Sequence, residues 1–122
     1  MREFRGNVII TDHAKERFIQ RRVNSRVRDG YVNVYKKMLN MIFRSTLVGT
    51  KKQDNGEVHE YRANKGCIFV CARKYAENFW EKDDVIILTV QLNRWYIEDR
   101  IDRGIDINTL GLNDLVKQSI RY

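Results

Sequence analysis

Three side chains spaced four residues apart, His13, Arg17 and Arg21, form the pattern in this sequence with the clearest chemical meaning. On a helix such residues lie about one turn above one another, so an imidazole would head a column of permanent cations. An imidazole titrates near neutral pH, and guanidinium groups bind phosphate oxygens through two parallel hydrogen bonds. The pattern therefore predicts a phosphate-bearing partner, or proton transfer at a phosphodiester.

The helix that carries these residues is expected to begin at Thr11 or Asp12, either of which can act as N-cap, and to end near Arg22. At 100° per residue, Ala14 and Phe18 fall on the side predicted to face the core. The His-Arg line falls along the border of that side, where it would line a cleft between the helix and a sheet. The alternative is that the arginine stems cover an apolar edge and keep their charged ends in solvent.

The basic charge is concentrated in the first half of the chain. The sequence has 23 Lys and Arg against 16 Asp and Glu, a net charge of +7. Residues 1–61 hold 13 basic and 7 acidic residues, a net +6, whereas residues 62–122 hold 10 and 9, a net +1. An arginine-rich cluster favours a polyanionic partner, and a basic surface that serves solubility is the alternative. The predicted nucleic-acid contacts are Lys15, Arg22, Arg26 and Arg28.

Length and composition predict one soluble domain. The chain has 122 residues, contains no proline and has no apolar run long enough to cross a membrane. Its charged N-terminus does not resemble a signal peptide. Two cysteines give neither a disulfide framework nor a complete zinc set, so Cys67 and Cys71 are expected to be buried thiols in a reducing, cytoplasmic compartment. On a strand they would lie about 13 Å apart, too far for one ion. We predict neither a metal nor a cofactor.

The order of expected elements predicts an α+β fold. Helices and strands are segregated, which favours two N-terminal helices packed on a four-stranded, mainly antiparallel sheet. Residues 1–92 would form this core, and residues 93–122 a C-terminal helical extension of the same domain. Besides the first helix and a short strand at Val8–Ile10, we expect a helix after Asp29, strands at Thr46–Lys52, Val58–Ala63, Cys67–Tyr75 and Val85–Leu92, and helices at Trp95–Ile101 and Asn108–Ile120.

The segment from Ile9 to Arg21 resembles the Thr-x-His-Ala-x-x-Arg-x-x-x-Arg opening of a family of small bacterial and phage domains. Those domains are related to the barnase, EndoU, colicin and RelE group of metal-independent ribonucleases. The run from Val85 to Val90 is similar to the closing strand of that family, and the order of elements agrees. The resemblance covers residues 8–92 and implies a RelE-like or barnase-like fold.

The resemblance also implies functional roles for His13, Arg17 and Arg21, and a supporting role for Thr89. Ribonucleases of that group often activate a ribose 2′-hydroxyl against the adjacent phosphate without a metal. His13 would act as base or acid, and the arginines would hold the phosphate and its developing charge.

One histidine without a partner makes a poor enzyme, so further catalytic candidates are needed. His59 and Tyr61 share one face of a predicted strand. They can converge with His13 if that face is turned toward the first helix, and otherwise both are structural. Four aromatic residues are expected to pack in the core or at its rim, with base stacking as the alternative: Phe79, Trp80, Trp95 and Tyr96.

The leading interpretation is an RNA-directed protein, with metal-independent, toxin-like endoribonuclease activity as its enzymatic form. A second interpretation is a non-catalytic, phage-type modulator that binds nucleic acid or a host nucleic-acid-processing enzyme. A third is an adaptor in which Asn93 to Tyr122 binds a protein partner or a second copy. None of the three involves a membrane.

Overall fold

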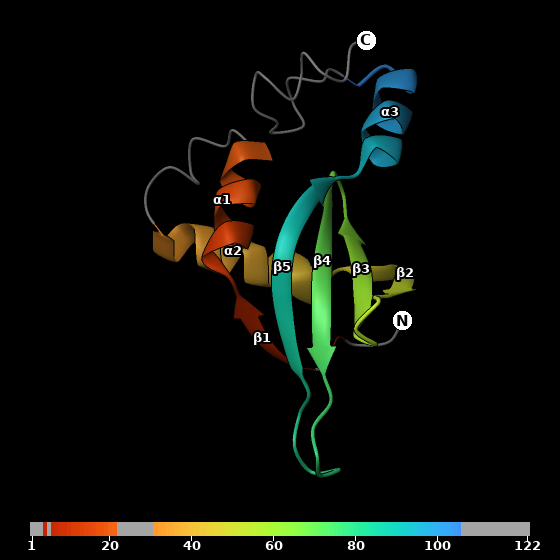
Figure 1. Cartoon of the computed structure of the whole chain (residues 1–122). Coiled ribbons are helices and arrows are strands. Elements are labelled where there is room, and N and C mark those ends of the chain that lie inside the picture. The colour runs from red at the N-terminus through yellow and green to blue at the C-terminus, as the bar shows by residue number, and fades with distance from the viewer. Residues whose placement is uncertain (1–3, 5, 22–30, 106–122) are drawn as a thin grey trace.

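The computed structural model describes residues 4, 6–21 and 31–105 of the chain. Helices and strands are segregated along it, and the fold is α+β as predicted (Figure 1). The expected loop at Asn24–Asp29 and the expected helix at Asn108–Ile120 lie outside the described residues. The elements are β1 (Asn7–Ile10), α1 (Asp12–Arg21), α2 (Tyr31–Phe43), β2 (Thr46–Lys52), β3 (Val58–Asn64), β4 (Cys67–Lys74), β5 (Asp84–Leu92) and α3 (Arg94–Asp102).

The sheet corrects the fold that we expected from the sequence. It has five strands in the order β1-β5-β4-β3-β2, and β1 runs parallel to β5 while the other pairs are antiparallel. The prediction of two N-terminal helices on a four-stranded, RelE-like or barnase-like sheet is therefore wrong. The physical reason is that β5 offers a free edge, and Val8 and Ile10 align on it with Val85 and Ile87.

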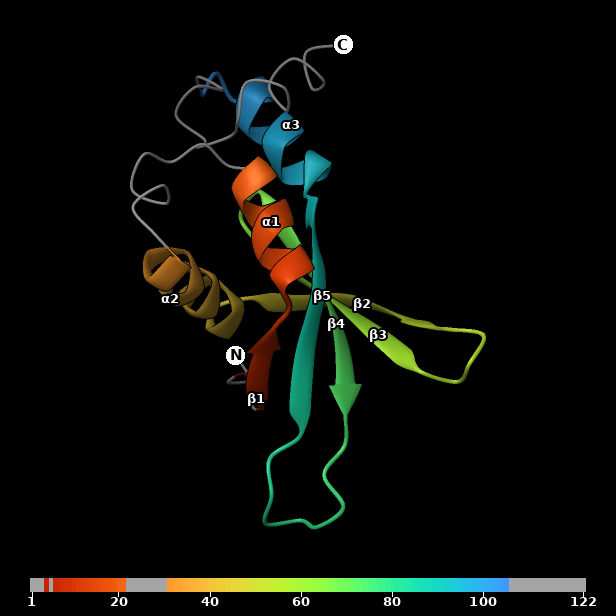
Figure 2. The same ribbon diagram turned by 60° about the vertical axis from the view of Figure 1, so that its left-hand side comes forward.

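Tight turns join β2 to β3 and β3 to β4. The predicted hairpin turn at Asp54–Gly56 is confirmed, with Gly56 at φ +86°, a conformation that glycine adopts without a steric penalty. Lys65 takes φ +51° in the turn between β3 and β4. Figure 2 shows the β2–β3 hairpin bending away from β4 and β5, so the sheet is strongly twisted.

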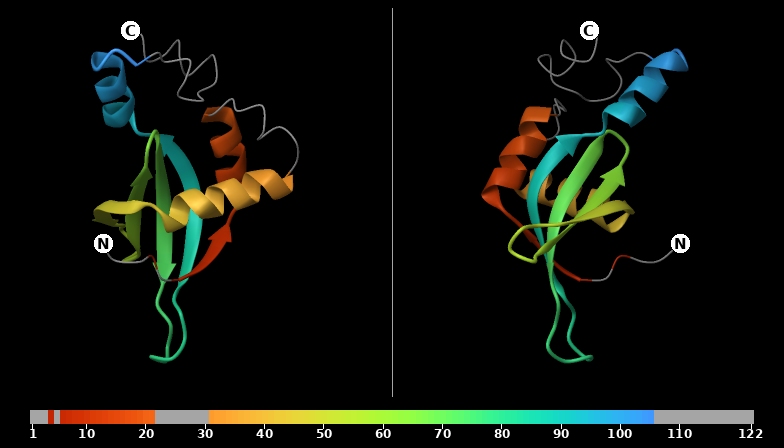
Figure 3. Two further views of the ribbon diagram at one scale, coloured as in Figure 1. Left: turned by 180° about the vertical axis from the view of Figure 1, so that it is seen from behind. Right: turned by 45° about the vertical axis from the view of Figure 1, so that its right-hand side comes forward.

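One side of the sheet, which we call the helix side, carries the hydrophobic core. Figure 3 shows α2 lying across this side. Ala14 and Phe18 of α1 are fully buried in the core, as the helical spacing predicted. The other buried members are Ile10, Val34, Met38, Met41, Ile42, Cys67, Phe69, Cys71, Val85, Ile87 and Val90.

The opposite side of the sheet, which we call the open face, has none of the described helices lying across it (Figure 1). Strand partners share a face, and residues that alternate with Phe69 and Cys71 of the core belong to this side. Its described members are Lys51, His59, Tyr61, Ala63, Ile68, Val70, Ala72, Ile86, Thr89 and Gln91.

The third helix is tied to the turn between β3 and β4. The Asn93 side chain accepts a hydrogen bond from the N–H of Tyr96 as N-cap of α3, and it donates to the carbonyl of Lys65 at 3.1 Å. Ile97 is fully buried beside this turn. No helix among the described residues is long and apolar enough to span a bilayer.

Candidate nucleic-acid interface

Thr11 fixes the start of α1 against the sheet. Its hydroxyl accepts a hydrogen bond from the N–H of Ala14 at 3.1 Å, which makes Thr11 the N-cap of the two predicted candidates. The same hydroxyl donates to the carbonyl of Ile87 at 2.7 Å, and the Thr11 N–H donates to that carbonyl at 3.3 Å. The direction of α1 along β5 is therefore set by one residue that joins both elements.

The two flanks of α1 face different surroundings. Lys15 lies on the flank toward α2, where its ammonium is 5.9 Å from the centre of the Tyr35 ring and 3.6 Å from Asp12. Because Ala14 and Phe18 point into the core, helical spacing leaves His13 and Arg17 on the other flank, away from α2. The predicted border position of the His-Arg line thus holds for these two residues.

His13 and Arg17 differ in how they are held. The His13 side chain is exposed, whereas the half-buried Arg17 donates a hydrogen bond to the Gln20 side chain at 3.1 Å. The backbone of Arg21 belongs to α1, but its side chain lies outside the described structure. The other predicted cations, Arg22, Arg26 and Arg28, also lie outside the described residues.

His59 and Tyr61 lie next to each other on the open face. His59 is level with Lys51 on β2 and Ala72 on β4, and Tyr61 is level with Gly49 and Val70. A Cβ added at Gly49 would meet no atom within 4 Å, so the backbone beside Tyr61 is open. The His59 imidazole lies 3.9 Å from Glu57, and its side chain is largely buried. The two ring systems lie beside Val70 and Ala72 of β4, both of which are buried.

The structure does not bring His13 together with His59 and Tyr61. β5 and β4 separate α1 from β3, and two strand spacings amount to about 10 Å. No hydrogen bond joins these three side chains among the described residues. The hypothesised acid–base cluster therefore has no direct hydrogen bond within the described part of the chain, since α1 contacts β5 and two strands separate it from β3. Thr89, the predicted supporting residue, lies on the open face of β5, between the two groups.

The helix side of β3 holds a charge network that sequence reasoning missed. Arg73 donates two hydrogen bonds to Glu60, at 2.5 and 3.3 Å, and a third to Asp83 at 3.3 Å. Arg62 lies 3.8 Å from the same glutamate and stacks over the Phe4 ring at 4.7 Å. These hydrogen bonds and the charge of Glu60 raise the pKa of Arg73. Polar residues occupy both faces of Val58–Ala63, so their alternation did not indicate that Glu60 and Arg62 would lie inside, on the helix side.

Cys71 lies beside this network and is not a nucleophile at neutral pH. Burial, reinforced by the negative charge of Glu60, raises the pKa of its thiol from 9.0 to about 12. Its neighbours on β4 leave it inside the core, as predicted for a structural thiol. Among the described residues, no group of His, Cys, Asp and Glu side chains is placed to hold a metal ion.

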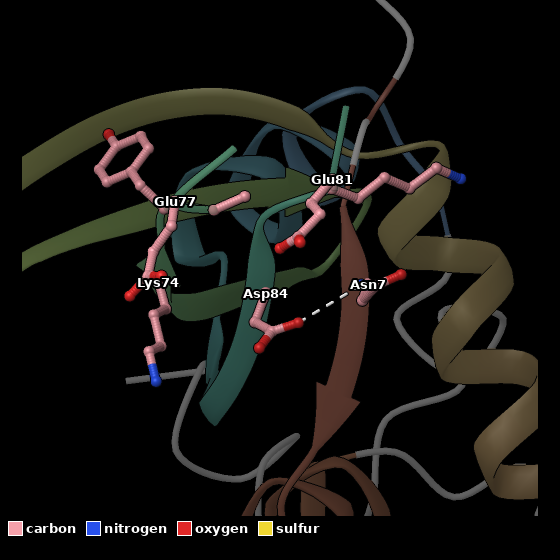
Figure 4. A pocket seen from close by; sticks show the side chains of 8 residues that line it. Asn7, Lys74, Glu77, Glu81 and Asp84 are labelled. Carbon is pink, nitrogen blue, oxygen red and sulfur yellow. Dashed lines mark hydrogen bonds between the residues drawn. The ribbon is translucent and has the colours of Figure 1, made fainter. Parts of the chain in front are cut away.

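A polar hollow of about 510 Å³ lies where β1 meets the connection between β4 and β5 (Figure 4). The Asn7 amide donates to the Asp84 carboxylate across it at 3.4 Å, and Lys74, Glu77 and Glu81 also line it. Acidic side chains outnumber Lys74 and Lys82 in this lining, which is unfavourable for a polyanion.

The predicted packing of the aromatic residues is wrong for three of the four. Phe79, Trp80 and Trp95 are exposed, and only Tyr96 is half-buried, with Arg100 stacked over its ring at 4.8 Å.

Comparisons with protein-family models, curated proteins and solved structures found no match to this chain.

Proposed function

We propose that this protein binds single-stranded RNA across the open face of its sheet. The observation that carries the proposal is the pair of ring systems, His59 and Tyr61, level with Lys51 and with the open backbone at Gly49. Unpaired bases stack on aromatic side chains, whereas a duplex hides its bases from a sheet surface. A lysine beside the rings would contact the phosphate that joins two stacked bases.

The edge of the open face next to β5 supports the same function. His13 and Arg17 stand on the flank of α1 that faces away from α2, and Thr89 lies on the open face of β5, the strand that α1 contacts. A strand of RNA that crosses β3, β4 and β5 would reach these side chains with its next phosphates. The net +6 of residues 1–61 strengthens binding through the release of counterions.

Binding is favoured over cleavage. A ribonuclease that needs no metal requires a base and an acid on opposite sides of the reacting phosphate. His13 has neither His59 nor Tyr61 within one strand spacing, so no acid or base partner for it is in place. His13 is therefore proposed as an RNA contact. The test must also show whether the protein cleaves the RNA that it binds.

Fluorescence anisotropy with a labelled single-stranded RNA tests the proposal. The wild type should bind this RNA more tightly than an RNA duplex, and affinity should fall as salt rises from about 50 to 200 mM. Tyr61→Ala should weaken binding roughly 5- to 150-fold, because it removes one stacked base. Tyr75→Ala, which removes an exposed tyrosine from the connection that follows β4, is the matched control.

Absence of binding, or equal loss in both variants, would overturn the proposal. A DNA strand of the same sequence shows whether the ribose 2′-hydroxyl contributes. Incubation of the same RNA with wild type and His13→Ala in the presence of a chelator tests cleavage. Cleavage by the wild type alone would establish the enzymatic form with His13 in it.

A further inference from the structure

The connection between β4 and β5, residues 75–83, forms a finger that projects from the end of the sheet opposite α3 (Figure 1). Asp83 anchors its base, accepting hydrogen bonds from the N–H of Ala76 at 2.8 Å and from Arg73 at 3.3 Å. At its tip, the N–H of Glu81 donates to the carbonyl of Asn78 at 3.1 Å. The finger is thus a hydrogen-bonded turn that holds its tip in a defined position.

The turn presents two large apolar side chains to solvent. Phe79 and Trp80 occupy its central positions and are 96% and 69% exposed. Their rings touch edge to face, with centroids 5.0 Å apart. Adjacent exposed aromatic rings at a loop tip are typical of a contact surface, since their desolvation favours association.

The same finger also forms one wall of a recess of about 540 Å³. Phe79 and Trp80 line one part of it, and Phe4 and Phe43 line another, with their ring centroids 5.6 Å apart. Arg73 lies at the recess but is already bonded to Glu60 and Asp83, so it offers a neutralised surface. Glu81, Lys82 and Asp83 complete the lining, so the recess offers aromatic rings for packing beside charged side chains that can pair with opposite charges.

We propose that two copies of this chain pair through their fingers, with Phe79 and Trp80 of each copy seated in the recess of the other. A surface that carries both the protruding rings and a matching recess is self-complementary, as a two-fold interface requires. Glu81 and Lys82 are exposed neighbours on this surface, so a two-fold axis would bring Glu81 of one copy to Lys82 of the other.

Charge separates this surface from the RNA site. The finger and the strand ends beside it carry two lysines, Lys74 and Lys82, against four acidic residues, Glu77, Glu81, Asp83 and Asp84. That balance disfavours a nucleic acid as occupant. Three aromatic side chains that are 71%, 96% and 69% exposed, Tyr75, Phe79 and Trp80, would bury about 350–600 Å² on each copy, or about 700–1,200 Å² in total. This total is near the lower limit for a specific interface and predicts association that depends on concentration.

Sedimentation equilibrium of the full chain over a wide range of concentrations tests the pairing. The average mass should rise from 14.6 kDa toward twice that value. Phe79→Ser and Trp80→Ser should each raise the dissociation constant about 10-fold or more, as central aromatic residues of an interface do. Trp95→Ser is the control, because Trp95 is 79% exposed on α3 and should leave association unchanged.

A charge exchange tests the two-fold geometry. Glu81→Lys alone should weaken association, and adding Lys82→Glu to the same chain should restore it, because both contacts are then reversed together. A wild type that stays at 14.6 kDa throughout would overturn the proposal, as would finger variants that associate like the wild type. RNA binding by Phe79→Ser should equal that of the wild type, so this test is independent of the proposed function.

Discussion

Neighbouring residues of β3 occupy two different environments. Glu60 and Arg62 are turned to the helix side, where Arg73 and the Phe4 ring enclose them. His59 and Tyr61 are turned to the open face, where no described helix covers them. The first pair is charged yet nearly enclosed, whereas the second is half-buried, with 19% of the His59 side chain exposed.

The difference shows that residue type alone does not separate the stabilising side of a strand from the binding side. A buried charge is tolerated only when its partners satisfy it, so loss of a partner should affect folding. A half-buried ring on the open face keeps part of its surface in solvent, so its removal should affect binding.

Arg73→Met should give the largest effect. It leaves Glu60 and Asp83 without their shared cation, and the free energy of unfolding should fall by about 3–5 kcal/mol. Urea denaturation measures this change. Lys74→Met, at the exposed next position, should change stability by less than about 0.5 kcal/mol. Equal stability of the two variants would contradict a stabilising role for the network.

The Cys71 thiol should make stability depend on alkaline pH. Below about pH 9 the thiol is protonated in both the folded and the unfolded chain. Because the folded pKa is raised to about 12, only the unfolded chain loses this proton between pH 9 and 12. The wild type should therefore lose about 1.4 kcal/mol per pH unit in that window relative to Cys71→Ala. A difference between the two proteins that stays constant with pH would contradict the prediction.

Thr11→Val should have an intermediate effect on both stability and RNA binding. It removes the N-cap of α1 and the hydroxyl bond to Ile87, which together should lower stability by about 1–2 kcal/mol. Thermal unfolding measures the change, with Thr46→Val at an exposed position of β2 as control. RNA affinity should fall as well, because Thr11 sets where His13 and Arg17 stand. Unchanged RNA affinity would show that α1 is not part of the proposed interface.

Arg17→Gln should give the smallest effect, confined to RNA binding. Loss of one phosphate contact should weaken binding several-fold and reduce the salt slope by about 1. Lys36→Gln, which removes an exposed cation from α2, should leave the slope unchanged. A slope that falls equally in both variants would mean that only overall charge matters.

Local patterns predicted the elements well, and they failed where pairing is non-local. The strand Thr46–Lys52 has the bounds that were expected, and the Asp54–Gly56 turn gives the hairpin its register. The parallel pairing of β1 with β5 was missed because a strand of four residues has no local feature that identifies the strand with which it pairs.

His59 and Tyr61 were named as candidates from the sequence, but the buried side of the element could be predicted for α1 and not for β3. Ala14 and Phe18 mark the buried side of α1 through helical spacing alone, and His13 and Arg17 follow from them. In β3, polar residues stand on both faces, so alternation could not tell which pair would be inside. The burial of Glu60 depends on Arg73, which arrives from another strand.

The bond between Thr11 and Ile87 joins positions 76 residues apart in the sequence. The N-terminal elements β1 and α1 can therefore make their native contacts only after β5, near the end of the described core, has been placed. Folds dominated by such distant contacts close large loops at an entropic cost and reach the native state slowly. We therefore expect β1 and α1 to join last during refolding, after the hairpins from β2 to β5 have assembled.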